Sequence, residues 1–498
     1  KNLLLCIDQG TTSSKSALIS ENLKIVFKNT YPQKNIYQNP GWSETDPTLL
    51  YSKVKALCNE SLKTSQKEFS DFQTTGIGIT NQRETCLVWN RLTGEPYCNA
   101  ILWNDLRTKD LVDGLIHFSN NNGEAYKEIC GLPLSTYFSA FKFKYMIENV
   151  PEINRKVHNH ECNDLCFGTI DSWLVYKLTK GKRFVTDVTN ASRTMLMNLD
   201  TLQWDTSMCN IFGIPKECLP QIISSSDDFG ESEDLDMKLP ITGVVGDQMS
   251  ACLGHCLEMH QVKNTYGTGG FLLMNTGAEK IFSNKGLLTT VLYKNRDQEV
   301  VFGLEGSIES AGNTLTWLKE NLGIFNDYKE LKDLFLSEKD SGDVYFVPSF
   351  SGLYSPYWNS SAKASIQGMT MNTSKGHLVR AAFEAVSLRT NDIIQSFEED
   401  TDVKIHLLKV DGGMTNSNEF LQTQSDLANI KVNVKEESEI TLLGSAVAAG
   451  IGNGIYSDVQ SVSKVLEKGK VFSPKLNKED LEIKYLKWKM AVERSMNW

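Results

Sequence analysis

The chain has 498 residues, too many for one compact core, so we expect two large domains or a few smaller ones. Its net charge of −10 argues against a non-specific nucleic-acid binder, which would be basic. No apolar stretch approaches the roughly 18 residues that span a bilayer, and no secretory signal is visible. The odd number of cysteines, 11, favours free thiols, so we expect a cytoplasmic protein without a membrane segment.

The chain opens with an apolar strand, residues 3–7, that leads into Asp8-Gln9-Gly10-Thr11-Thr12-Ser13-Ser14-Lys15. Gly10 lets the backbone approach a ligand closely, the N–H groups and hydroxyls can donate to phosphate oxygens, and Lys15 adds a positive charge. Asp8 can hold Mg²⁺, directly or through water. The alternative is an ordinary β-hairpin turn, because residues 16–20 and 24–27 also have strand patterns.

Further elements follow in the first half of the chain. We expect strands at residues 75–80, 84–89 and 100–103, and helices at residues 141–149 and 170–178. Asn81-Gln82-Arg83-Glu84-Thr85 follows the first of these strands, and polar residues at a strand end often line a cleft. Arg83 and Glu84 can satisfy polyol hydroxyls, or they form a surface ion pair.

A second candidate cluster follows the expected strand at residues 241–245. Phosphoryl transfer to an alcohol needs a carboxylate that orients the hydroxyl and accepts its proton, and Asp247 is placed for this role. The alternative is that Asp247 caps the next helix. Trp103, Tyr137 and Phe271 either wall a site for a small polyol or belong to the core.

The second half repeats the opening pattern. A strand at residues 262–266, a glycine-rich turn at residues 267–270 and a strand at residues 271–275 echo the first hairpin. Later, a strand at residues 407–410 runs into Asp411-Gly412-Gly413 and an expected helix at residues 418–427, a favourable place for an anion. The pattern predicts two similar α/β domains with a nucleotide between them, although such glycine turns are common in α/β proteins.

Other nucleotide and metal motifs have no support. Neither GxxxxGK[ST] nor a GxGxxG after a strand occurs. Two groups of metal-ligand residues lack the paired spacing of a structural zinc site, so buried thiols and surface histidines are the preferred interpretation. They are His158, His160, Cys162 and Cys166, and Cys252, His255, Cys256 and His260.

Taken in order, the motifs resemble the FGGY family of carbohydrate kinases, within the actin/hexokinase/Hsp70 ATPase superfamily, and in particular its glycerol-phosphorylating branch. They are residues 8–14, 78–85, 189–195, 246–248, 264–269 and 364–369, with 377–378 and 381–384. The resemblance covers nearly the whole chain. It implies two ribonuclease-H-like α/β domains with a deep interdomain cleft, residues 1–252 binding glycerol and residues 253–498 binding ATP. It also implies Mg²⁺-dependent, in-line phosphorylation of glycerol to sn-glycerol 3-phosphate, and a homodimer or homotetramer.

The resemblance also implies roles for single residues. Asp247 is expected to be the general base, and Asp8 and Asp247 to lie beside the metal. The substrate-binding residues are expected to be Arg83, Glu84, Trp103, Tyr137, Asp247, Gln248 and Phe271. The nucleotide-binding residues are expected to be Thr11, Thr12, Ser13, Lys15, Thr268, Gly312, Thr316, Gly413 and Ser417.

The chain departs from the family pattern in a few places. Lys15 stands where the family often has Arg; lysine keeps the positive charge but lacks the bidentate fork of arginine. Tyr145 stands where the family has a Trp. The family pattern expects one polar residue after Gly413 to contact the nucleotide, and this residue is Asn416, Ser417 or Asn418. Residues 231–238 are mostly acidic, so we expect no control by fructose 1,6-bisphosphate, which binds a basic loop in bacterial enzymes. A kinase for another sugar or polyol, an actin- or Hsp70-like ATPase and an inactive scaffold remain alternatives.

Overall fold

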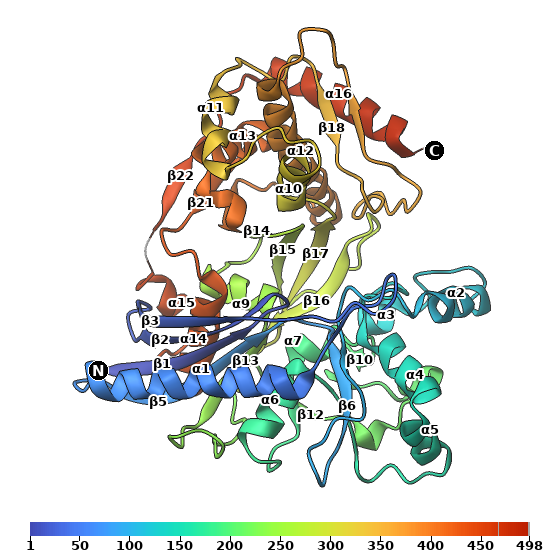
Figure 1. The fold of residues 1–498 in the computed structure, drawn as a ribbon, viewed down its shortest axis with the longest axis vertical. Helices are drawn as coiled ribbons and strands as arrows, with labels where there is room; N and C mark the ends of the chain where they lie inside the picture. Colours follow the sequence, from blue (N-terminus) through green and yellow to red (C-terminus); the bar gives the residue numbers. More distant parts are fainter. Residues whose placement is uncertain (467, 497–498) are drawn as a thin grey trace.

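The computed structural model describes residues 1–466 and 468–496. It contains two large sheets, one from each half of the chain, with helices between and around them (Figure 1). In the N-terminal sheet the first three strands are antiparallel, and β5 and β13 run parallel to β1. Its strands, in spatial order, are β13 (Ile241–Gly246), β5 (Gln73–Asn81), β1 (Asn2–Gln9), β2 (Ser13–Ser20) and β3 (Ile25–Pro32).

The C-terminal sheet repeats this order and these directions around β14. Its strands are β16 (Leu288–Tyr293), β17 (Val301–Ile308), β15 (Gly270–Gly277), β14 (Val262–Tyr266), β20 (Leu407–Gly412), β21 (Lys431–Val434) and β22 (Lys470–Phe472). The five strands from β21 to β17 correspond to the five strands from β13 to β3. The similarity expected between the two halves therefore extends beyond the first hairpin to all five strands of the N-terminal sheet.

Burial explains the continuous apolar run of β1. Residues 3–7 are fully buried because helices cover both faces of the sheet. Helix α1 (Pro47–Glu68) lies on one face, and α14 (Ile440–Gly452), from the far end of the chain, lies on the other. Glycines allow this close approach: a Cβ at Gly78 would lie 2.3 Å from the Ser445 carbonyl oxygen, and one at Gly243 would lie 2.3 Å from the Ala449 nitrogen.

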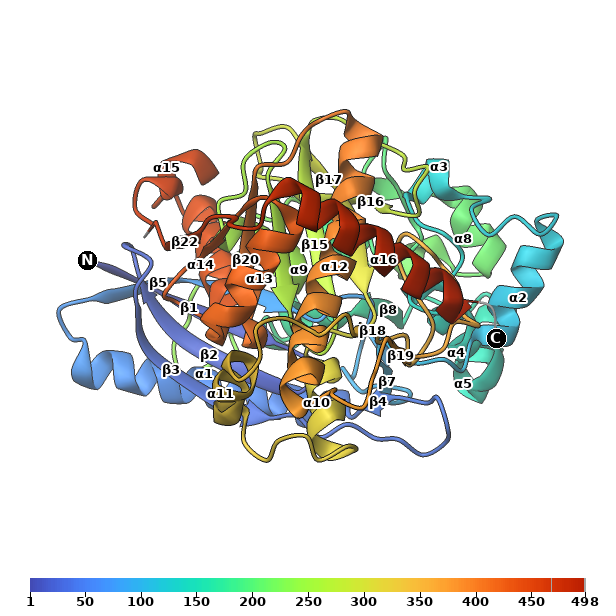
Figure 2. The ribbon, with the colours of Figure 1, turned by 90° about the horizontal axis from the view of Figure 1, so that it is seen from above.

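Helices also cover the C-terminal sheet (Figure 2). The helices not yet named are α2 (Lys109–Phe118), α3 (Lys127–Cys130), α4 (Ser139–Asn149), α5 (Pro151–His158), α6 (Ile170–Leu178), α7 (Val188–Ala191), α8 (Thr206–Phe212), α9 (Asp247–Gly254), α10 (Gly312–Glu320), α11 (Leu331–Leu336), α12 (Lys375–Thr401), α13 (Asn418–Ala428), α15 (Val459–Ser463) and α16 (Lys478–Met496). The 3₁₀ helices are η1 (Lys216–Cys218), η2 (Tyr328–Glu330) and η3 (Gly413–Asn416).

Smaller sheets complete the fold. Their strands are β4 (Glu44–Thr45), β6 (Cys86–Asn90), β7 (Ala100–Ile101), β8 (Leu165–Thr169), β9 (Val185–Asp187), β10 (Met197–Asn198), β11 (Gln203–Trp204), β12 (Gln221–Ile223), β18 (Tyr345–Val347) and β19 (Ser365–Gln367). Within the described residues, no helix combines the length and apolar character that crossing a bilayer requires. All eleven cysteines have free thiols.

Most expected elements are present, and two differences are informative. The strand expected from residue 84 begins at Cys86, because Glu84 has a left-handed backbone with φ of 60°. The strand expected at residues 100–103 ends at Ile101, and Trp103 lies beyond it. Both departures place a side chain of the candidate site in a turn. The domain limits 1–252 and 253–498 remain a prediction.

Candidate functional site

Three sequence motifs meet at one edge of the N-terminal sheet. Asp8 in β1 lies in register with Thr80 in β5, and Asn81 in β5 with Gly246 in β13. The carboxyl ends of these three parallel strands therefore lie side by side, the usual place for a ligand in an α/β fold. Asp8, the segment after β5 that contains Arg83, and Asp247 at the start of α9 all come to this edge.

Arg83 and Glu84 belong to a buried ionic network and not to a surface ion pair. Arg83 donates from Nη1 and Nη2 to the two carboxylate oxygens of Glu305 in β17, at 2.7 and 2.9 Å. Arg193 donates from Nε to Glu84 Oε1 at 2.6 Å and from Nη2 to Glu305 Oε1 at 3.3 Å. Two arginines thus balance two glutamates, and the arginines hold the pKa of Glu305 down at about 2, against the effect of its burial.

Asp247 is the first residue of α9, and Gly246 is its N-cap, so the alternative interpretation of Asp247 as the helix cap is wrong. Its carboxylate oxygen Oδ1 accepts a hydrogen bond from the Gln248 backbone N–H at 2.7 Å and lies 3.4 Å from Arg83 Nε. The side chain remains 29% exposed, so a ligand can reach it. Burial, assisted by the charge of Glu84, raises the pKa of the Asp247 carboxyl to about 6, although Arg83 opposes this.

The opening segment forms a hairpin whose turn lies next to this edge. Gly10 N–H donates to the Ser13 carbonyl at 2.9 Å, closing the turn that carries Thr11 and Thr12. Lys15 Nζ lies 2.6 Å from the carboxylate of Glu439, the residue before α14. The same carboxylate lies 2.6 Å from Lys28 Nζ. Thus the hairpin alternative is confirmed, and whether the turn also binds phosphate stays a prediction.

The site also fits a magnesium ion. Within the described part of the chain, no group of three or more His, Cys, Asp or Glu side chains is arranged as a metal cage. Mg²⁺ bound with a nucleotide needs only one or two carboxylates, because phosphates and waters supply the other ligands. Burial raises the pKa of Asp8 to about 7, and the negative charges of Asp247 and Glu439 add to this, against Lys15. A bound cation would relieve the repulsion between these carboxylates.

Three aromatic side chains of the expected glycerol site meet edge to face. The ring of Trp103 lies 5.5 Å from Tyr137 and 6.3 Å from Phe271, both near perpendicular. Trp103 donates from Nε1 to Thr11 Oγ1 at 2.9 Å, which connects the aromatic group to the hairpin turn. All three aromatic residues are partly exposed, so they are available to contact C–H groups of a ligand.

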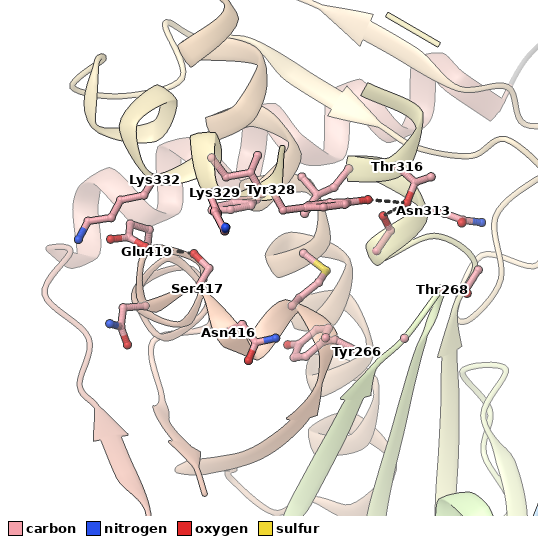
Figure 3. A pocket seen from close by; sticks show the side chains of 18 residues that line it. Tyr266, Thr268, Asn313, Thr316, Tyr328, Lys329, Lys332, Asn416, Ser417 and Glu419 are labelled. Carbon is pink, nitrogen blue, oxygen red and sulfur yellow. Dashed lines mark hydrogen bonds between the residues drawn. The ribbon is translucent and has the colours of Figure 1, made fainter. Parts of the chain in front are cut away.

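A pocket of about 830 Å³ lies in the C-terminal domain (Figure 3). It is lined by the five nucleotide-binding residues expected in that domain, namely Thr268, Gly312, Thr316, Gly413 and Ser417. Asn416 and Asn418 line it too, so the pocket does not separate these two from Ser417. Ser417 is the N-cap of α13 and accepts from the Phe420 N–H. Thr11, Thr12, Ser13 and Lys15 lie outside this lining, on the N-terminal hairpin.

Several residues that shape this region have no role that the sequence motifs predict. In the pocket these include Tyr328, whose hydroxyl lies 3.1 Å from Thr316 Oγ1, and Lys329 (Figure 3). In the buried interior they are Arg193, Glu305 and Lys263. The sequence does carry a signal for a buried charged residue, namely a charge inside an otherwise apolar strand, as Glu305 is in β17.

The fold and the site define a two-domain α/β protein of the actin-like ATPase class. The family model described as "FGGY family of carbohydrate kinases, N-terminal domain" matches residues 3–254, and that of the C-terminal domain matches residues 262–452. The chain belongs to the FGGY family of carbohydrate kinases.

Its relatives are similar over their full length. The chain is 41% identical to the glycerol kinase of Beutenbergia cavernae, covering 99% of this chain and 98% of the relative, and 40% identical to that of Chloroflexus aggregans, with the same coverage. A crystal structure of Plasmodium falciparum glycerol kinase with ADP superimposes with a TM-score of 0.92 at 40% identity, covering 100% of this chain and 99% of that one. Xylulose kinase from Lactobacillus acidophilus, with a TM-score of 0.86 at 20% identity and coverage of 99% and 98%, shares the fold.

Proposed function

We propose that this chain is an ATP-dependent glycerol kinase that forms sn-glycerol 3-phosphate. The main support is that Asp247, Arg83 and Glu84, the residues expected to hold and activate the alcohol, meet at one strand edge. Relatives named glycerol kinase match the chain end to end at about 40% identity. Release of ADP that depends on added glycerol tests the proposal. The expected homo-oligomer and the expected absence of bisphosphate control remain predictions.

The proposed chemistry starts from Asp247. Its partly exposed carboxylate orients a glycerol hydroxyl and accepts its proton as the oxygen attacks the γ-phosphorus in line, while the bond from the γ-phosphorus to the β–γ bridging oxygen breaks and ADP leaves. Arg83 and Glu84 bind the other hydroxyls, and Trp103, Tyr137 and Phe271 contact the carbon skeleton and exclude water. These contacts select the alcohol that lies within reach of Asp247.

The nucleotide is proposed to lie between the two domains. Its base and ribose occupy the pocket beside Thr316, Gly413 and Ser417, and its phosphates lie between Thr268 and the Thr11–Lys15 turn. Asp8, with Asp247 nearby, would hold Mg²⁺, which neutralises phosphate charge. Lys15 then exchanges its partner Glu439 for a phosphate oxygen, or binds both.

The rate should depend on pH through Asp247. A general base must be deprotonated, and burial raises the pKa of this carboxyl to about 6. Therefore kcat/KM for glycerol is expected to be constant above pH 7 and to fall about tenfold per pH unit well below 6. Steady-state assays from pH 5 to 8 at saturating MgATP measure this. A rate that stays constant down to pH 5 contradicts the assignment.

Replacing Arg83 by Lys should weaken glycerol binding selectively. Lysine keeps the charge that balances Glu305 but loses the planar fork, so the KM for glycerol is expected to rise about tenfold or more. The KM for ATP should change much less. Arg389→Lys is the matched control, because Arg389 is a buried arginine that also binds a glutamate with two nitrogens, Glu309, in the other domain. Equal rises in both KM values for Arg83→Lys would disprove the role.

A further inference from the structure

Lys263 is a fully buried lysine at the centre of the C-terminal sheet, outside the chemistry described so far. Its three ammonium protons match three acceptors. Nζ donates to Gln248 Oε1 at 2.6 Å, to Thr265 Oγ1 at 2.9 Å and to the Phe271 carbonyl at 3.2 Å. Burying a charge in this way is costly unless it is fully hydrogen-bonded. Two of its partners, Gln248 and Phe271, belong to the expected glycerol site.

The contact determines how the Gln248 amide is oriented. An ammonium group can only donate, so the atom of Gln248 that faces Lys263 must be the oxygen. The amide nitrogen, a donor of two protons, therefore points the other way. Within residues 1–466 and 468–496, Gln248 Nε2 makes no hydrogen bond with another protein group. Gln248 directly follows Asp247, so this donor lies in the site that is expected to bind glycerol.

Lys263 has a close structural counterpart without this contact. Lys409 lies directly opposite it in the parallel strand β20 and also reaches α9. Lys409 Nζ donates to the His255 and Cys256 carbonyls, at 3.0 and 3.2 Å, at the C-terminal end of the helix. The two lysines thus support opposite ends of α9, and only Lys263 touches a side chain of the expected site.

We propose that Lys263 is a positioning residue that fixes the amide of Gln248 so that its N–H groups donate to a hydroxyl of the acceptor alcohol. The ammonium group does not touch the substrate and acts through Gln248. With Asp247 accepting from the alcohol and Gln248 donating to it, the site matches a hydroxyl group, which both donates and accepts. This inference rests on the proposed glycerol kinase activity.

Lys263→Met tests the role, because methionine fills much of the same volume and removes the donor. We expect kcat/KM for glycerol to fall about tenfold to a hundredfold, while the KM for MgATP stays within about threefold. Adding Lys263→Met to Gln248→Met should cost little more than Gln248→Met alone, since both changes remove one interaction. Fully additive losses, or an unchanged kcat/KM for glycerol in Lys263→Met, would overturn the inference.

Two further variants separate positioning from stability. Lys409→Met removes the counterpart ammonium group and should lower the melting temperature with no selective effect on the KM for glycerol. Gln248→Glu keeps an oxygen for Lys263, and so keeps the fold, but presents no N–H donor. We expect it to lose glycerol affinity as Lys263→Met does, and wild-type affinity in this variant would contradict the proposal even if Lys263→Met does not fold. Wild-type protein without glycerol-dependent ADP release would overturn the proposed function and this inference together.

Discussion

Replacing Asp247 by Asn is expected to lower kcat for glycerol phosphorylation by about 10²–10⁴-fold, the range that a positioned general base contributes. Asparagine has nearly the same shape, and its oxygen can still accept from the Gln248 N–H. It cannot accept the proton of the attacking hydroxyl. Affinity for ATP, measured by calorimetry, should change little, because the pocket lies in the other domain.

Asp205→Asn provides the control for this substitution. Asp205 is the N-cap of α8, and asparagine serves nearly as well at that position, so activity and stability should both be retained. If Asp247→Asn turned over glycerol at a rate near that of the wild type, Asp247 would not be the base. A parallel loss of ATP affinity would instead indicate that the change disturbs metal or nucleotide binding.

Glu305→Gln is expected to cost about 3–5 kcal/mol of folding stability, the effect of removing one partner from a buried ion pair. Arg83 and Arg193 would then both be buried with one carboxylate fewer, leaving Glu84 beside Arg193 and the partly exposed Asp247 beside Arg83. Because Glu305 comes from the C-terminal sheet and both arginines from the N-terminal half, the loss should also weaken the attachment between domains. Urea unfolding followed by tryptophan fluorescence measures the shift in midpoint.

Glu161→Gln is the matched control. Glu161 pairs with Arg155 at 2.6 Å, but both side chains are 54% exposed, and such pairs contribute at most about 1 kcal/mol. If Glu305→Gln unfolds at the same urea concentration as Glu161→Gln, the network does not hold the domains together.

Local patterns were sufficient to predict much of the fold. The apolar run before Asp8 predicted a strand, which is β1, and residues 170–178 and 262–266 match α6 and β14 to the residue. The strand-end positions of Asp8, Arg83 and Asp247 also marked each of them as a candidate site residue. Such features depend on neighbouring residues and on the general rule that ligands bind at the carboxyl ends of strands.

Long-range partners could not be predicted in the same way. Arg83 and Glu305 are 222 positions apart, and Lys15 and Glu439 are 424 apart, so no local pattern connects them. Glu84 has a left-handed backbone because it lies in a tight turn held by its neighbours, where a strand pattern alone predicted extension. Lys263 carried a signal, a charge within a buried strand, but its partner on α9 is defined only by the packing of helix on sheet.

Phosphorylation of glycerol can be measured as ADP release from MgATP across a panel of glycerol, xylulose, ribulose and gluconate, with each product identified by NMR. We expect release that depends on glycerol, with kcat/KM for glycerol well above the others and sn-glycerol 3-phosphate as the product. ATP hydrolysis that no polyol stimulates, or a clear preference for one of the larger substrates, would show that this protein is not a glycerol kinase.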